Sequence, residues 1–177
     1  MSDGTLFTDL KERKLIRTIV PRGLVRSLKL DVKLADPSDA QQLYEREFPC
    51  VSTQLLLDRM TMISLNEVCE VFFPLIGVKP YNATEFKVAR ENVDTIVSLY
   101  EKRLKKQQYL VCDDHETLAD LISAAAFSLG FISFFDETWR SKHPEVTRWF
   151  NRVIKSRFFE GEFESFKMCE TEMQPIK

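Results

Sequence analysis

Apolar residues recur at helical spacing along most of the chain from Ser52 onward. One broad apolar face runs from Ser52 to Pro74, and the stretch from Phe86 to Leu104 follows the i, i+3, i+4, i+7 pattern of an amphipathic helix. The segment from Asn82 to Glu85 has the form of a capping box, in which two side chains bind otherwise unpaired amides. We therefore predict one helix up to Pro74 and a long second helix that begins at Asn82.

Two further helices are predicted in the last third of the chain. The segment from Thr117 to Asp120 forms another capping box, and the residues up to Leu129 are apolar on nearly every side. We expect this helix to be the central buried one, with the Phe-rich residues 127–135 in the core. Another helix should follow His143, with His143 as its cap or as a surface residue rather than a general base. The polar chain after Lys167 is expected to be frayed.

The first 50 residues alternate between strand and helix patterns. The segments Gly4 to Thr8 and Leu30 to Leu34 are predicted strands. Helical spacing of apolar residues predicts a helix from Val20 to Lys29, with Pro21 in its first turn, and another from Ser38 to Glu47. The order is therefore β-α-β-α.

Composition excludes several classes of protein. Of 177 residues, 44% are hydrophobic and 29% are charged, which is typical of a globular protein rather than a disordered one. The net charge of −2 gives no general attraction to nucleic acid or anionic lipid. The N-terminus lacks the apolar core of a secretory signal, and no apolar stretch is long enough to cross a bilayer. We therefore expect a cytoplasmic protein that does not enter membranes.

Candidate chemical groups are few. The four cysteines are irregularly spaced, which favours reduced, mostly packed thiols over a zinc knuckle or a redox pair. Cys112 and His115 have metal-binding atoms, but two ligands in one loop do not make a tetrahedral site, so we expect a solvated loop and no metal. The basic run from Lys102 to Lys106 lacks interleaved aromatic residues, so direct nucleic-acid binding is not expected.

Five segments carry a resemblance to a known family. They are residues 4–6 (GTL), 20–24 (VPRGL), 28–33 (LKLDVK), 139–144 (WRSKHP) and 148–151 (RWFN). Together they resemble the glutathione-transferase-like domain of the gamma subunit of translation elongation factor one, in its fungal form. The resemblance implies a mostly α fold, in which a transferase-type C-terminal helical bundle follows an incomplete β-α-β-α thioredoxin-like subdomain. The implied division is a partial subdomain at 1–50, an anomalous junction at 51–65 and the helical domain at 66–177.

The resemblance fails where the family would bind glutathione. There the family continues with a strand, a cis proline, a second strand and a helix, whereas no proline lies between Pro49 and Pro74 here. Several tens of residues are therefore expected to be missing. Phe7 stands near the position of the family's thiol-activating hydroxyl, so no catalytic residue is predicted. Arg17 and Thr18 are the only candidates for a vestigial glutathione site, and glutathione is the only cofactor considered.

The resemblance implies a non-catalytic binding or scaffold protein that docks to the exchange-factor subunits of the elongation complex. Thr117 and Asp120 then serve folding rather than chemistry. An alternative is a glutathione transferase with residual thiol-transfer or peroxidase activity. A third possibility is an internally deleted form of a longer parent that folds marginally. The sequence leaves open whether the chain forms homo-oligomers.

Overall fold

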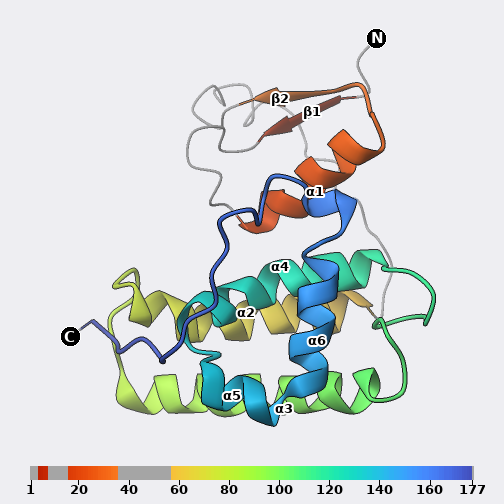
Figure 1. The fold of residues 1–177 in the computed structure, drawn as a ribbon. Coiled ribbons are helices and arrows are strands. Elements are labelled where there is room, and N and C mark those ends of the chain that lie inside the picture. Colours follow the sequence, from red (N-terminus) through yellow and green to blue (C-terminus); the bar gives the residue numbers. More distant parts are fainter. Residues whose placement is uncertain (1–3, 8–15, 36–56, 177) are drawn as a thin grey trace.

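The computed structural model describes residues 4–7, 16–35 and 57–176 of the chain (Figure 1). Helices dominate this part, and two short strands precede them, so the predicted fold class is confirmed. In chain order the elements are β1 (Gly4–Phe7), α1 (Ile16–Ser27), β2 (Val32–Ala35), α2 (Leu57–Leu75), α3 (Ala83–Leu104), α4 (Leu118–Ser133), α5 (Glu137–Lys142), α6 (Pro144–Val153) and the 3-10 helix η2 (Arg157–Phe159).

The two strands pair in parallel, with Gly4 opposite Val32 and Phe7 opposite Ala35. A parallel pair needs a crossover connection, and α1 lies within the connection from β1 to β2. Strand β1 lies within the extended stretch predicted from Gly4 to Thr8, and β2 overlaps the strand predicted from Leu30 to Leu34 but begins two residues later. The helix predicted from Ser38 to Glu47 lies outside the described residues.

Helix α1 begins at Ile16 rather than at Val20, so the prediction that Pro21 lies in its first turn is wrong. Pro21 sits inside the helix, where it removes one backbone hydrogen bond. The helix also buries Ile19 and Val20, which are 8% and 5% exposed. A proline inside a helix costs about 3 kcal/mol, through the lost hydrogen bond and the clash of its ring with the preceding turn. Burying two such apolar side chains contributes about 3–6 kcal/mol. Tertiary packing therefore retains the helix through the proline.

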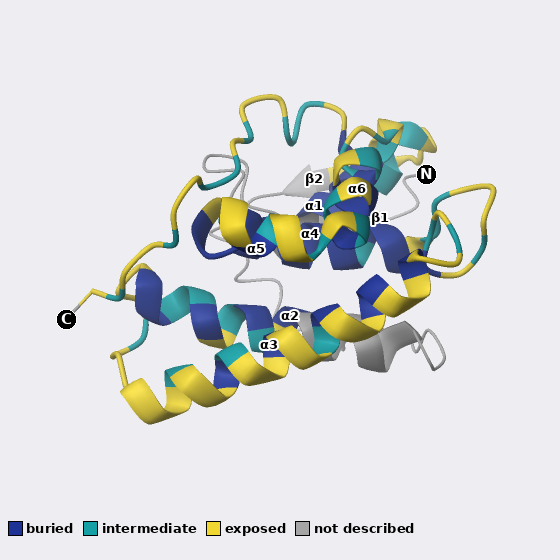
Figure 2. Ribbon diagram, turned by 60° about the horizontal axis from the view of Figure 1, so that its bottom comes forward, coloured by how far each residue is buried: buried dark blue, intermediate teal, exposed yellow. Residues whose placement is uncertain are grey.

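The helical part is layered around α4. Helix α2 lies beside α4, α3 packs on α2, α1 packs on α4, and α6 crosses α3 and α4 (Figure 1). Figure 2 shows that the buried residues of these helices face one another, while one face of α3 stays exposed along its length. Within the described residues, no helix combines the length and the apolarity needed to span a membrane.

Helix α4 is the central buried helix, as its sequence predicts. Its Ala124, Ala125 and Ala126 are at most 3% exposed, which lets neighbouring helices approach closely. A Cβ atom on Gly130 would lie 2.3 Å from the Phe135 ring, so a glycine is required at this contact.

Aromatic side chains fill the space between α4, α5 and α6. Phe131 stacks on Phe150 with ring centroids 4.0 Å apart, and Phe135 stacks on Trp139 at 3.7 Å. The four phenylalanines of residues 127–135 are fully buried, which confirms that this stretch belongs to the core: Phe127, Phe131, Phe134 and Phe135.

The predicted start of α3 is confirmed. The Asn82 side chain accepts hydrogen bonds from the amides of Thr84 (3.0 Å) and Glu85 (3.2 Å). The Glu85 carboxylate in turn accepts a hydrogen bond from the Asn82 side-chain amide at 3.4 Å. Two of the unpaired amides at this helix end are therefore satisfied locally.

Helix α5 was not predicted. It has six residues, too few for apolar periodicity to reveal it. The Asp136 carboxylate caps it by accepting the amide of Trp139 at 2.8 Å. This turn redirects the chain from α4 into α6.

The expectation that the chain frays after Lys167 is wrong. The amides of Cys169 and Met173 each donate to a carbonyl of the last turn of α4, at 2.8 Å. The Arg140 guanidinium also donates to the Cys169 carbonyl at 2.6 Å. The last carbonyls of a helix have no partners within it, and the tail supplies them here. Because these hydrogen bonds join backbone groups, the polar side chains of this segment did not indicate them.

Candidate functional site

The carboxylate of Asp120 joins three separate parts of the helical domain, and its side chain is fully buried. One oxygen accepts the backbone amide (2.9 Å) and the hydroxyl (2.6 Å) of Thr117, which forms the capping box of α4. The other accepts the amide of Leu110 and the indole N–H of Trp149, both at 2.8 Å. Asp120 therefore fixes the α3–α4 loop and helix α6 relative to the start of α4.

A second polar link lies just before this cap. In a hydrophobic staple an apolar residue would occupy the position of Glu116. Instead, the Glu116 carboxylate accepts a hydrogen bond from the Ser156 hydroxyl at 2.7 Å. The start of α4 is thus tied to the chain beyond α6.

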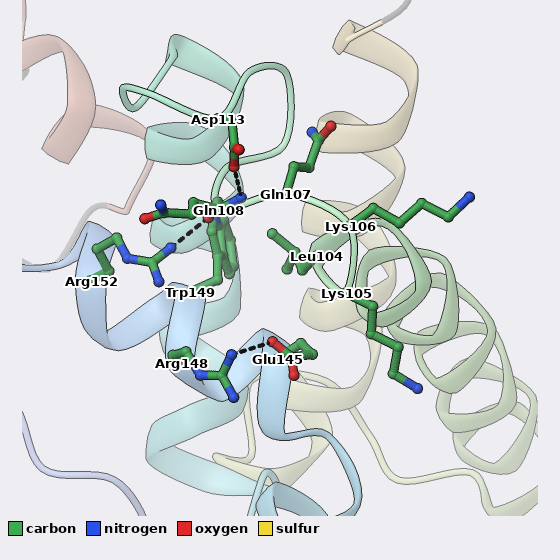
Figure 3. Close-up of a pocket in the computed structure, with 10 residues that line it drawn as sticks. All are labelled: Leu104, Lys105, Lys106, Gln107, Gln108, Asp113, Glu145, Arg148, Trp149 and Arg152. Atoms are coloured by element: carbon green, nitrogen blue, oxygen red, sulfur yellow. Dashed lines mark hydrogen bonds and ion pairs between the residues drawn. The ribbon is translucent and has the colours of Figure 1, made fainter.

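A polar cleft of about 280 Å³ lies between the end of α3, the loop after it and α6. Figure 3 shows Arg148, Trp149 and Arg152 on the α6 side and the two lysines on the α3 side. The residues lining the cleft are Leu104, Lys105, Lys106, Gln107, Gln108, Asp113, Glu145, Arg148, Trp149 and Arg152.

Both arginines of the cleft are partly engaged. Arg148 pairs with Glu145 at 2.7 Å, and Arg152 donates to the Gln108 carbonyl at 2.6 Å. The Arg152 guanidinium also lies over the Tyr109 ring, 5.4 Å from its centroid. These contacts hold the guanidinium groups at the cleft wall, where their remaining N–H groups can donate to a ligand.

Lys105 and Lys106 add two further positive charges at the rim, and neither has an ion-pair partner within the described part of the chain. The ten lining residues of the cleft include four cationic side chains and two carboxylates. Its excess of cationic donors suits the binding of a carboxylate or another anion.

Helix α6, which forms one wall, is capped from outside its own sequence. The carboxylate of Glu101 in α3, 7% exposed, accepts the amides of Glu145 (3.1 Å) and Val146 (3.0 Å). A buried negative charge at a helix N-terminus complements the helix dipole and satisfies unpaired amides.

His143 occupies the cap position, but its side chain makes no capping hydrogen bond. Burial lowers the pKa of its imidazole.

The loop after the cleft differs from its sequence expectation in one respect. His115 and Asp114 are exposed, as expected, but three side chains converge there. The Cys112 sulfur lies 3.7 Å from each ring nitrogen of His115, and His115 Nδ1 lies 2.8 Å from the Asp114 carboxylate. The pKa of Asp114 is lowered, first by a hydrogen bond from its own backbone amide and then by His115.

The expected glutathione residues, Arg17 and Thr18, lie in the first turn of α1. The structure describes the backbone there but not these two side chains, so their role stays a prediction. Cys50 lies outside the described residues. Cys112 and Cys169 are free thiols, as expected.

Helix α1 is clamped against the chain after α6. Arg22 pairs with Glu162 at 2.8 Å, and both side chains are nearly inaccessible to solvent (6% and 4% exposed). A Cβ atom on Gly23 would lie 1.7 Å from the carbonyl oxygen of Phe158. The backbones of α1 and η2 therefore meet at a contact that only glycine allows. Sequence spacing could not reveal this contact, because its two sides are about 135 residues apart.

Comparison with known proteins identifies the family to which this chain belongs. The family model described as the glutathione S-transferase C-terminal domain matches residues 66–156. A Saccharomyces cerevisiae protein, named as a homolog of elongation factor 1 gamma, is 73% identical and is aligned over the whole of both chains. The chain belongs to the glutathione transferase family, in its elongation factor 1-gamma type.

Other relatives agree with this family assignment. Elongation factor 1-gamma 1 of S. cerevisiae is 32% identical over 99% of the chain, which spans 52% of that protein. The crystal structure of the transferase-like domain of elongation factor 1-gamma from S. cerevisiae matches with a TM-score of 0.81, at 32% identity over all of both chains. A glutathione-bound transferase from Methylobacillus flagellatus, at 11% identity and a TM-score of 0.65, shares the fold.

The comparison also bears on the length of the chain. The alignment with the 73% identical relative spans 225 positions, whereas the chain has 177 residues, so 48 positions hold no residue of this chain. This difference agrees with the expectation that several tens of residues are missing. Within the described residues the subdomain contributes only a two-stranded sheet and one helix.

Proposed function

We propose that the chain is a non-catalytic, transferase-like binding module that docks to exchange-factor subunits of the elongation factor 1 complex in the cytoplasm. The observation that carries this proposal is the full-length match to the transferase-like domain of elongation factor 1-gamma, together with an alignment to a 73% identical relative in which 48 positions hold no residue of this chain. The helical domain keeps its buried core and its caps, whereas the family's glutathione-binding segment has no counterpart in the sequence between Pro49 and Pro74.

The cleft beside α6 supports a location for the proposed docking. Four cationic residues and two carboxylates line it, which is a net positive surface on a chain whose overall charge is −2. We assign to it an acidic segment of the partner protein, because carboxylates pair well with arginine and lysine donors. The cleft lacks the exposed aromatic platform that single-stranded nucleic acid requires, since its only aromatic residue, Trp149, is 1% exposed.

Co-purification tests the docking proposal. The tagged full chain should retain elongation-factor exchange subunits from a cytoplasmic extract, and purified subunits should reproduce the binding. Reversing two charges with Lys105→Glu and Lys106→Glu should weaken binding by about tenfold or more and reduce its salt dependence. The control is Lys87→Glu, on helix α3 itself but outside the cleft, 78% exposed. Equal binding by both variants would remove the cleft from the proposal.

Enzymatic activity is the competing function, and it is tested separately. Retention on glutathione-agarose and conjugation of a chlorinated nitrobenzene would support a residual transferase. Turnover that disappears in Arg17→Ala or Thr18→Ala, without any binding of elongation-factor subunits, would overturn the docking proposal. We expect neither retention nor turnover.

A further inference from the structure

The α3–α4 loop holds three metal-binding side chains that the docking proposal does not use. One ligand atom each from Cys112, Asp114 and His115 lies within 4.8 Å of the other two. They stand on one short bend, next to the wall of the cleft formed by Asp113. Their donor set of one sulfur, one imidazole nitrogen and one carboxylate oxygen is typical of sites for zinc-like cations.

The observed distances fit a tetrahedral cation. Zinc binds sulfur at about 2.3 Å and nitrogen at about 2.0–2.1 Å, so two such ligands at a tetrahedral angle stand about 3.6 Å apart. The sulfur of Cys112 lies 3.7 Å from either ring nitrogen of His115. The oxygen of Asp114 and the nitrogen of His115 are 2.8 Å apart because they share a proton, and a cation would replace that proton.

The bend is held in place from both sides. The amide of Leu110 before it and the amide of Thr117 after it both donate to Asp120, at 2.8 and 2.9 Å. Within the loop, the carboxylate of Asp113 accepts the amide of Gln108 at 2.7 Å. A cation therefore meets ligands whose backbone is already positioned, which reduces the entropy lost on binding.

The local charge also favours a cation. Three carboxylates lie within residues 113–116; Asp114 belongs to the converging set, while Asp113 and Glu116 accept hydrogen bonds from Gln108 and Ser156. Their negative potential attracts a divalent ion.

We propose that Cys112, Asp114 and His115 bind one divalent transition-metal cation of the zinc type, with solvent completing its coordination. Binding releases the thiol proton to solvent, while the proton between His115 and Asp114 moves to the other ring nitrogen, so the imidazole stays neutral and no redox partner is needed. The site adds a property to the chain that does not depend on docking.

Cobalt(II) is the probe, because thiolate ligation gives it a near-ultraviolet charge-transfer absorption that zinc lacks. The full chain, reduced and kept free of oxygen, should develop this band with one equivalent of cobalt. Zinc should abolish the band by competition, and magnesium, which prefers oxygen ligands, should not. Cys112→Ser should remove the band, and His115→Gln should weaken cobalt binding at least about tenfold.

The control variants Cys50→Ser, Cys69→Ser and Cys169→Ser should keep the band, and circular dichroism should show the same helix content in every variant. No band in the wild-type chain at excess cobalt would overturn the proposal. A band that persists in Cys112→Ser would overturn it equally, since the thiolate would then come from elsewhere. Both readouts are independent of partner binding, so failure of the docking proposal leaves this test intact.

Discussion

The indole N–H of Trp149 donates to the carboxylate of Asp120 across 2.8 Å of protein interior, where the two side chains are 1% and 0% exposed. The residues are 29 positions apart and belong to helices α6 and α4. Because the same carboxylate oxygen also accepts the amide of Leu110, one side chain sets the position of α6 and of the loop that borders the cleft.

Trp149→Phe tests this relationship, because it keeps an aromatic ring but removes the donor. Hydrogen bonds to carboxylates contribute about 1.5–3 kcal/mol, so the free energy of unfolding should fall by about this amount beyond the effect of the smaller ring. Urea denaturation with an unchanged m-value measures it.

The matched control is Trp139→Phe. Trp139 is also buried, at 8% exposure, but its indole N–H has no hydrogen-bond partner within the described residues. This variant loses a similar ring and no hydrogen bond, so it should be clearly less destabilised. Equal losses in the two variants would show that the hydrogen bond to Asp120 adds no stability.

Glu101→Gln tests the external cap of α6. Glutamine keeps one acceptor oxygen and removes the negative charge that faces the amides of Glu145 and Val146. We expect a loss of about 1–2 kcal/mol in the free energy of unfolding, and less ordered amides in the first turn of α6 by hydrogen exchange. Glu91→Gln, an exposed residue of the same helix at 65% exposure, should change stability by less than about 0.5 kcal/mol. A similar small effect at Glu101 would contradict the cap.

The sequence predicts the local features of this fold well and the distant contacts poorly. The caps at Asn82 and Thr117 depend on residues within four positions, so a sequence pattern reveals them. Leu110 and Trp149, which complete the Asp120 network, are separated from it by a loop and a helix and carry no such pattern. The packing of the chain after Lys167 against α4 was not predicted for a related reason. Its amides at Cys169 and Met173 donate to α4 carbonyls, and every residue type except proline has such an amide.

The cleft shows the same division. The basic run that ends α3 was visible in the sequence, and its solvated lysines are found at the rim. The other half of the cleft comes from Arg148 and Arg152, whose distance from that run depends on how α6 crosses α3. The charge pattern of one segment therefore does not predict a cleft that is lined by residues from two separate helices.

Gly23→Ala tests the clamp between α1 and η2. In an exposed helix this change stabilises by about 1 kcal/mol, because alanine is the better helix former. Here the new Cβ would lie 1.7 Å from the Phe158 carbonyl oxygen, so α1 must separate from η2. We expect the opposite sign: lower stability, and faster hydrogen exchange and proteolysis of residues 16–35. Ser27→Ala, which removes one exposed hydrogen bond to the Arg157 carbonyl, should leave both rates nearly unchanged. A stabilised Gly23→Ala variant would mean that the two backbones are not in contact in solution.

His143 should make the stability of the domain depend on pH. Burial lowers the pKa of its imidazole in the folded chain, and Lys142 acts in the same direction, while Glu101 and Asp94 oppose the shift. The unfolded chain therefore takes up a proton at a higher pH than the folded chain. Because the unfolded state then binds more protons, stability is present above the unfolded pKa of about 6.5 and is lost as the pH falls below it. Thermal unfolding between about pH 7.5 and pH 5.5 should show a drop that is smaller in His143→Gln. An unchanged drop in that variant would assign the pH dependence to other groups.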